Sequence, residues 1–395
     1  MRKWVSLLVV LIMLSTTVSL AACSNTSETE ESTYKVGAIL SVTGAYSNLG
    51  VPEKQTLEML TEEINAEGGI NGRQLEMIIY DNESNAEKAA TLATRLIERD
   101  EVLAILGPTT TGDSMAIIDT VTSGEIPLIS MAAGISIITP IEERYWVFKT
   151  PQTEKEAVSE IYLYMQENGI KDIAIITDTS GFGAGGRAYL LSEKDSYGIN
   201  ILDDQTFSSG DTSMQSQLTH IKGTDAEAVI VWATDKESSI VASDMKALEM
   251  TIPLFASHGI ANMAFINNAG EAANGVIFPA GKLLIADQVP ATDQQQKILV
   301  DYKNDFESKY GTGTISTFGG HAYDALGMLT IALEKMDGDM TLVDARAKLR
   351  DEIEKINNFV GTGGVFTMSP QDHLGMLPGS LAMFEIVDGE WTLAP

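Results

Sequence analysis

The sequence contains a single cysteine, Cys23, in 395 residues, and only four histidines, at positions 220, 258, 321 and 373. A lone thiol has no intramolecular disulfide partner and cannot complete a cysteine-rich zinc site. The histidines lie far apart along the chain, without the spacing of metal ligands. The sequence therefore predicts no disulfide, no metal site and no cofactor.

Positive charge is also scarce. Lysine and arginine number 26 against 55 aspartates and glutamates, which gives a formal charge of −29. Such a chain repels nucleic acid and anionic lipid surfaces. The only long apolar run, residues 4–14, is too short to span a bilayer as a helix. These absences argue against a nucleic-acid-binding protein and against a multispanning membrane protein.

Motifs of catalysis are missing or incomplete. The sequence has neither G-x-S-x-G nor H-E-x-x-H. Residues 181–186 (GFGAGG) match the dinucleotide fingerprint, and Asp203 follows at about the required distance. However, residues 178–180 separate these glycines from the preceding apolar run, and an exported chain would meet little nicotinamide cofactor. Asp337 and Asp339 hint at calcium but lack the rest of an EF-hand loop. We therefore expect no enzyme.

The N-terminus carries the features of an export signal. Arg2 and Lys3 precede the apolar run, and residues 15–22 are small and weakly polar. Residues 20–23 (LAAC) resemble the bacterial lipobox, in which the cysteine thiol is lipidated before cleavage. We expect a signal peptide over residues 1–22, with Cys23 as the lipidated first residue of the mature protein.

Residues 23–33 are polar and acidic, as is typical of a solvated tether. Two or more acyl chains at one terminus give stable membrane anchoring. The sequence thus predicts a soluble, acidic body anchored by lipid to the outer face of the cytoplasmic membrane, at the cell surface or in the periplasm.

Apolar runs alternate with helical patterns over the rest of the chain. Residues 34–42 form the first such run, and Leu57, Leu60 and Ile64 follow with helical spacing. The pattern restarts at residues 172–178. Alternation of this kind is typical of α/β proteins, in which helices cover both faces of a parallel sheet.

The second series repeats the first at a constant offset of 126 residues. The pairs are Asn85 and Asp211, each a candidate helix N-cap; Glu101 and Glu227, each opening an apolar run; and Ile126 and Ile252, each opening the letters IPL. The offset predicts two similar open sheets. Parallel sheets bind ligands at the carboxyl ends of their strands, so a cleft between the two sheets is the expected site.

Hydroxyl groups gather at one of the loops expected in this cleft. Residues 108–112 (PTTTG) place three threonines just before a predicted helix. A helix N-terminus offers free N–H groups and a partial positive charge, which suit a carboxylate. Ordinary N-capping would need only one of the three hydroxyls. We expect this loop to hold the acid group of a ligand.

Residues 34–393 resemble the periplasmic leucine/isoleucine/valine-binding protein family of bacterial ABC importers. The motifs that carry the resemblance are VGAILSVTGAYSNLG, INAEGGINGRQLEMIIYDNES, ILGPTTTGDS, IPLISMAAG, DTSGFGAGG, GEAANGVIFP and YDALGMLTIAL. The resemblance implies two doubly wound, parallel-sheet lobes joined by three crossovers, the type I periplasmic binding protein fold. It places residues 34–151 and 280–364 in the first lobe, and residues 152–279 and 365–395 in the second.

The resemblance also implies site residues. In the family, hydroxyls and backbone amides of the first lobe hold the ligand carboxylate, while the opening loop and two aromatic residues contact its body. The matching positions are Tyr46, Leu49, Thr110, Thr111, Ala132, Ala133, Phe182 and Phe318.

One position departs from the family pattern. The family places a glutamate against the ligand's ammonium group, and His258 occupies that position here. A neutral imidazole is a poorer counter-ion than a carboxylate, and a protonated one repels an ammonium. Either His258 faces a ligand without an amino group, or it only packs locally and Asp235 binds the ammonium. Both interpretations stay open at this point.

The resemblance implies a lipid-anchored substrate-binding protein that works with an ABC permease and ATPase. The expected ligand is a branched-chain amino acid or a related small apolar carboxylate, captured by a monomer through hinge closure. An aromatic or branched acid without an amino group is the alternative ligand. The alternative role is a ligand-sensing ectodomain for a separate signalling partner, since the same fold serves signalling receptors.

Overall fold

The structure is a computed structural model that describes residues 33–338 and 340–395. The predicted signal peptide, Cys23, all of the tether except Thr33, and Asp339 lie outside the described residues. Within the described part of the chain, none of the helices has both the length and the apolar character needed to cross a membrane.

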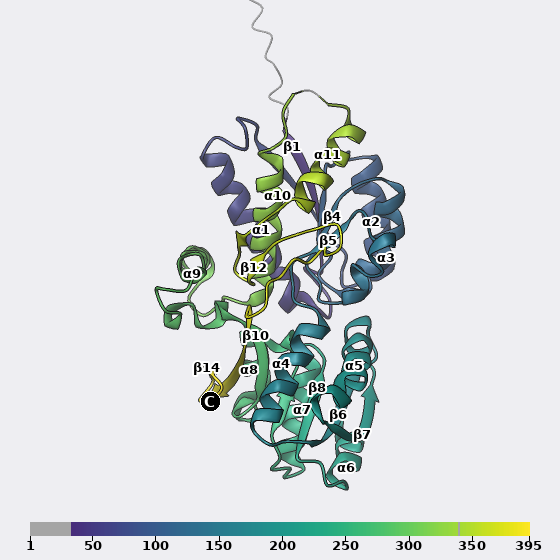
Figure 1. Ribbon diagram of the computed structural model, residues 1–395, viewed down its shortest axis with the longest axis vertical. Coiled ribbons are helices and arrows are strands. Elements are labelled where there is room, and N and C mark those ends of the chain that lie inside the picture. The colour runs from purple at the N-terminus through teal and green to yellow at the C-terminus, as the bar shows by residue number, and fades with distance from the viewer. Residues whose placement is uncertain (1–32, 339) are drawn as a thin grey trace, which may run out of the picture. The chain divides into compact units, whose positions relative to one another are not determined.

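The first sheet is parallel and has the strand order β2-β1-β3-β4-β5. Its strands are β1 (Tyr34–Leu40), β2 (Leu75–Asp81), β3 (Ile105–Leu106), β4 (Leu128–Ser130) and β5 (Val147–Lys149). The helices α1 (Ser47–Ala66), α2 (Ala86–Glu98), α3 (Thr111–Ser123), α10 (Thr317–Leu333) and α11 (Leu342–Glu354) surround it (Figure 1). One apolar core joins this sheet to these helices, and we call the assembly the first lobe.

The second sheet has the strand order β14-β13-β10-β9-β8-β6-β7. Five strands are parallel: β6 (Asp172–Asp178), β7 (Asn200–Phe207), β8 (Ala228–Trp232), β9 (Leu254–Ala256) and β10 (Ile277–Gly281). Two antiparallel strands, β13 (Leu381–Val387) and β14 (Glu390–Leu393), close one edge. The helices are α4 (Glu154–Glu167), α5 (Gly181–Glu193), α6 (Gln215–Lys222), α7 (Asp235–Ala247), α8 (Met263–Ala269) and α9 (Gln296–Tyr310).

We call this second sheet and its helices the second lobe. The predicted fold class, α/β with two parallel-sheet lobes, is confirmed. Sequence reasoning did not predict the antiparallel hairpin β13–β14, nor the two-stranded hairpin β11 (Phe359–Val360) and β12 (Val365–Phe366).

Local sequence explains where several helices begin and end. Asn85 caps α2 by accepting a hydrogen bond from the backbone N–H of Lys88 at 2.9 Å. Gly68 and Gly69 follow α1 with φ of 102° and 75°, a region that L-residues with a Cβ rarely adopt. The predicted N-cap of α2 is therefore confirmed, and the two glycines explain why α1 ends where it does.

The 126-residue repeat holds at one pair of strands and fails at one helix. Strands β4 and β9 begin at Leu128 and Leu254, which keep the offset. The predicted N-cap at Asp211 is wrong. Helix α6 begins at Gln215, and Asp211 Oδ2 instead accepts from the N–H of Ser208 at 2.9 Å in a local turn.

The chain passes between the lobes three times. Two of the expected lobe boundaries, residues 280 and 365, need correction. The chain leaves each apolar core later than these residues. The second core includes buried residues of α9, such as Leu299 and Phe306. The first core includes Phe366 and Leu374, which precede the return to β13. The boundaries that we propose therefore lie near residue 316 and between residues 374 and 381.

His373 lies in the last of these segments and is buried, with 1% of its surface exposed. A polar loop such as this one favours a solvent-exposed side chain, so this burial does not follow from the local sequence. Its Nδ1 lies 2.8 Å from the carbonyl oxygen of Val147, and its ring packs on Phe148. The loop folds back over β5, a long-range contact that local sequence does not reveal.

Candidate functional site

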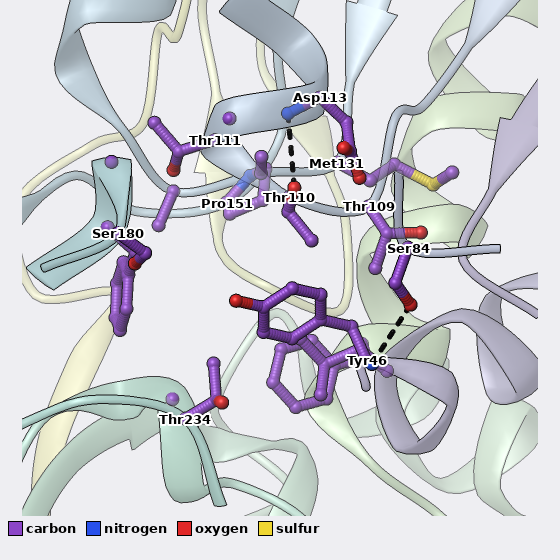
Figure 2. Close-up of a pocket in the computed structure, with 18 of the residues that line it drawn as sticks. Tyr46, Ser84, Thr109, Thr110, Thr111, Asp113, Met131, Pro151, Ser180 and Thr234 are labelled. Carbon is purple, nitrogen blue, oxygen red and sulfur yellow. Dashed lines mark hydrogen bonds between the residues drawn. The ribbon is translucent and has the colours of Figure 1, made fainter. Parts of the chain in front are cut away.

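A cavity of about 280 Å³ lies where the carboxyl ends of the two sheets face each other. The loops after β1, β3 and β4 line one side, the loops after β6, β8 and β9 line the other, and α10 contributes two rings. Figure 2 shows the Tyr46 ring in the cavity, with Thr110 and Thr234 on opposite walls. The lining residues are Tyr46, Leu49, Ser84, Ala86, Thr109, Thr110, Thr111, Gly112, Asp113, Met131, Ala132, Ala133, Pro151, Ser180, Gly181, Phe182, Thr234, His258, Gly259, Phe318 and His321.

The wall from the first lobe is the N-terminus of α3. Thr110 Oγ1 caps the helix by accepting from the N–H of Asp113 at 3.1 Å (Figure 2). Thr111 Oγ1 accepts from the N–H of Gly134 at 3.2 Å, which ties the Ala132–Ala133 loop to the helix start. The three threonines thus have different roles, and only one is the cap. A helix start bordered by hydroxyls is suited to an anion.

A buried carboxyl group supports this wall. Thr109 Oγ1 donates to Glu53 Oε2 and accepts from the N–H of Ser41 at 3.0 Å. Glu53 is completely buried, and burial raises the pKa of its carboxyl group well above the usual value. A neutral Glu53 adds no negative charge behind the threonines. Asp113, the one acidic residue in the lining, accepts from Ser41 Oγ at 3.3 Å.

The wall from the second lobe is largely made of rings and small residues. The ring of Phe182 meets the rings of His258 and Trp232 with centroids 5.2 and 5.8 Å apart. Gly259 is needed here, because a Cβ at this position would lie 2.6 Å from the carbonyl oxygen of Ala233. None of the lining residues from this lobe is acidic.

The glycines of residues 181–186 lie at the start of α5, and close packing explains why these positions have no side chain. A Cβ at Gly183 would lie 2.1 Å from the carbonyl oxygen of Asp178, and a Cβ at Gly186 would lie 2.3 Å from the ring of Trp232. These glycines let α5 pack closely on β6 and β8. The match to the dinucleotide motif thus has a structural cause that involves no cofactor.

Two histidines face the cavity in neutral form. His258 and His321 are 4% and 3% exposed. Burial is the main cause that lowers the pKa of each imidazole to about 3, with a smaller contribution from the charge of Lys149. Both ring nitrogens of His258 and Nδ1 of His321 have no hydrogen-bond partner among the residues that the structure describes.

The structure brings nine of the ten residues expected to contact ligand to this cavity: Tyr46, Leu49, Thr110, Thr111, Ala132, Ala133, Phe182, His258 and Phe318. Asp235 is the exception. It begins α7, is 2% exposed, and accepts from Asn48 Nδ2 of the first lobe at 2.9 Å. Its carboxylate therefore joins the two lobes and does not line the cavity, which weakens the interpretation that it binds an ammonium.

Sequence reasoning missed several lining residues, including Ser180, Thr234 and His321. Ser180 and Thr234 follow β6 and β8, so their position at strand ends was an available signal. His321 lies three residues after Phe318 on α10, a spacing that places two side chains on the same helix face.

A second contact also links the lobes beside the cavity. The N–H of Ile135 donates to Glu154 Oε2 at 2.8 Å, from the loop after β4 to the first turn of α4. Together with the bond between Asn48 and Asp235, it holds the two walls against each other. Such a site has the features of a two-lobed binding protein that encloses a small molecule.

The comparisons with known proteins agree with this class. The model of the periplasmic binding protein family matches residues 33–390, and the chain belongs to this family. Its resemblance to the leucine/isoleucine/valine-binding proteins is confirmed by its curated relatives.

Two of these relatives are the Leu/Ile/Val-binding protein BraC3 of Rhizobium johnstonii and the Leu/Ile/Val/Thr-binding protein of Salmonella typhimurium. Each is 22% identical. The first match covers 62% of this chain and 66% of that protein, and the second covers 65% and 70%.

Solved structures show the same fold. An extracellular ligand-binding receptor from Rhodopseudomonas palustris superposes with a TM-score of 0.85 at 25% identity, over 92% of this chain and all of that one. The branched-chain amino acid transporter substrate-binding protein LivJ of Streptococcus pneumoniae, in complex with isoleucine, superposes with a TM-score of 0.79 at 24% identity, over 91% and 98%.

Proposed function

We propose that this protein is the exported substrate-binding component of an ABC importer, and that it captures a small, partly apolar carboxylate by hinge closure. The observation that carries the proposal is the contrast across the cavity. Thr110 and Thr111 border a helix N-terminus on one wall, while Phe182 and Phe318 present apolar rings from elsewhere in the lining. The first wall suits an acid group and the rings suit a hydrocarbon body.

Branched-chain amino acids are the first ligands to consider, because the named relatives bind leucine, isoleucine and valine. Acids with the same body but no amino group are the alternative, because His258 is neutral and the second-lobe lining carries no acidic residue. An ammonium group buried without a counter-ion is costly.

A thermal-shift screen tests the proposal. The panel holds leucine, isoleucine, valine, aliphatic and aromatic monocarboxylic acids, and the amides of the same acids as uncharged controls. A ligand that binds only the folded state raises the melting temperature with its concentration. We expect at least one acid to do so and its amide to have little effect. If no carboxylate shifts the melting temperature, or if the amides act equally, the proposed ligand class is wrong.

Closure of the lobes should accompany binding, because enclosing a ligand in a cavity of this size requires the two walls to meet. We expect small-angle scattering to show a smaller radius of gyration with a saturating ligand. Identical profiles with and without that ligand would contradict hinge closure.

We further propose that Cys23 carries a lipid anchor and that the protein acts as a monomer beside its permease. Cys23→Ser should leave the protein unprocessed or release it from membranes, since lipidation needs the thiol. Unchanged membrane fractionation would contradict the anchor.

The R. palustris structure is described as a ligand-binding receptor, which keeps a sensing role as the second candidate. Loss of uptake of the identified ligand in a deletion strain would support transport. Normal uptake with a lost transcriptional response would support sensing.

A further inference from the structure

Three buried polar atoms in the cavity lining have no hydrogen-bond partner in the described part of the chain, and they belong to neither of the threonines at which we place the carboxylate. Nδ1 and Nε2 of His258 and Nδ1 of His321 are buried and lack hydrogen-bond partners within the described residues. The two side chains come from different parts of the fold, the loop after β9 and helix α10. Buried polar groups are normally hydrogen-bonded, so these three nitrogens mark a place where a ligand can supply the missing partners.

The surroundings of these imidazoles disfavour a cationic ligand group. Lys149 lies near enough for its charge to act on both rings, and its Nζ donates to the carbonyl oxygens of Pro151 and Gln152. Asp113, the only acidic residue of the lining, belongs to the first lobe and accepts from Ser41. An ammonium group placed against His258 would therefore meet a nearby positive charge and no counter-ion among the second-lobe residues that line the cavity.

We propose that His258 and His321 form a second polar subsite that binds an uncharged hydroxyl group of the ligand. A neutral imidazole has one N–H donor and one acceptor nitrogen. A hydroxyl group both donates and accepts, so it can satisfy one nitrogen of each kind. An ammonium group can only donate, and a plain hydrocarbon leaves all three nitrogens unpaired. The ligand class is therefore a small hydroxy acid.

The subsite rests on the proposed function, because the carboxylate of the same ligand is placed at Thr110 and Thr111. Isothermal titration with matched acids tests it. One series shares a branched skeleton: 2-hydroxy-4-methylpentanoate, 4-methylpentanoate and leucine. The second series is a pair, 4-hydroxyphenylacetate and phenylacetate, in which the hydroxyl group lies at the end of the molecule opposite the carboxylate. We expect the hydroxy acid of at least one series to bind about tenfold more tightly than its parent without the hydroxyl group, the usual effect of one or two hydrogen bonds.

Variants assign the preference to the imidazoles. His258→Phe and His321→Phe keep a flat ring but remove the nitrogens, and each should reduce the ratio between hydroxy acid and parent acid. The measured quantity is the ratio of the two affinities, so a variant that weakens the binding of both acids equally leaves it unchanged. His258→Gln restores a donor and an acceptor and should keep a preference for the hydroxy acid. His220→Phe, on the exposed face of α6, is the matched control and should change nothing.

The outcomes separate this inference from the proposed function. Tight binding of leucine with weak binding of both hydroxy acids overturns the hydroxyl subsite and leaves the proposed function standing. A hydroxyl preference that survives both phenylalanine variants also overturns the subsite. If none of the five acids binds wild-type protein, the hydroxyl subsite is overturned, and the thermal-shift panel of carboxylates decides the proposed function separately.

Discussion

The two walls of the cavity come from equivalent places in a repeated scaffold, yet they differ in chemistry. In the first lobe, the loop after β3 runs into α3 with Thr110 and Thr111 at the helix start. In the second lobe, the equivalent loop after β8 runs into α7, where Asp235 turns to Asn48 of the opposite lobe. The repeated scaffold thus has two equivalent helix starts with different side chains. We propose that one meets the ligand's charge, whereas the other joins the lobes.

The loops one strand further along differ in the same way. After β4, Ala132 and Ala133 form a small-residue turn tied to Thr111 through Gly134. After β9, the equivalent turn carries His258. At these two loops the first lobe offers backbone amides, whereas the second offers a neutral ring; the hydroxyl groups of Ser180 and Thr234 lie elsewhere in the second-lobe lining. On this difference we propose that the first lobe holds the acid group and that the second lobe selects what is attached to it.

The largest expected effect concerns protonation of the second wall. The pKa of His258 is about 3 in the folded protein, below the ordinary value of 6.5, because the imidazole is buried. The low pKa of His258 makes its full contribution to the free energy of unfolding above pH 6.5. This contribution is lost as the pH falls toward 3, because in that window only the unfolded chain binds the proton. The loss amounts to about 1.4 kcal/mol per pH unit within that window.

Urea unfolding of wild type and His258→Phe at pH 7, 6, 5 and 4.5 measures this loss. The variant should lose less stability on acidification than wild type, and Thr111→Ser should follow wild type. Buried carboxyl groups such as that of Glu53 have the opposite effect, because their raised pKa stabilises the folded protein as the pH falls. This effect is shared by wild type and variant, so it cancels in the comparison. Parallel curves for wild type and His258→Phe would show that His258 is not buried in neutral form.

His258→Glu should convert the second wall into one that accepts an ammonium group. A carboxylate supplies the counter-ion that the imidazole lacks, so leucine should bind roughly 10- to 100-fold more tightly, the range for a hydrogen bond to a charged group. The parent acid without an amino group should bind more weakly. Titration of both ligands to the same preparation measures the change, and a shift in the same direction for both would contradict the selective role of this wall.

Thr111→Ala should weaken the first wall for every carboxylate. The variant loses a hydroxyl group beside the acid group and the bond that holds Gly134, so affinity should fall by roughly 1 to 3 kcal/mol. Thr111→Ser keeps the hydroxyl group and should bind nearly as wild type. Equal affinities of the alanine and serine variants would show that the hydroxyl group does not contact the ligand.

The smallest expected effect is at the contact between the lobes. Asn48→Ala removes the bond of 2.9 Å to Asp235, so the closed form should lose about 0.5 to 1.5 kcal/mol. All ligands should be weakened alike, because neither residue lines the cavity. A change in the preference between leucine and the acid without an amino group would show instead that Asp235 acts on the ligand.

Sequence patterns predicted the parallel sheets because these follow local rules, and the family resemblance supplied nine of the residues that line the cavity. One of the three threonines, Thr110, caps α3, and the rings of Phe182 and Phe318 lie where the resemblance implies. The direction of the Asp235 side chain could not be predicted, because it depends on Asn48, 187 residues away. The burial of His373 is likewise a tertiary effect, since its partner Val147 in β5 is 226 residues away in the chain.

A crystal structure of the protein with its tightest-binding acid would test the division between the two walls most directly. We expect the carboxylate of the ligand at Thr110, Thr111 and the amides near Ala132, and an uncharged polar group within hydrogen-bonding distance of His258 or His321. A carboxylate lying against the two imidazoles, with the hydrocarbon body at the threonines, would contradict it.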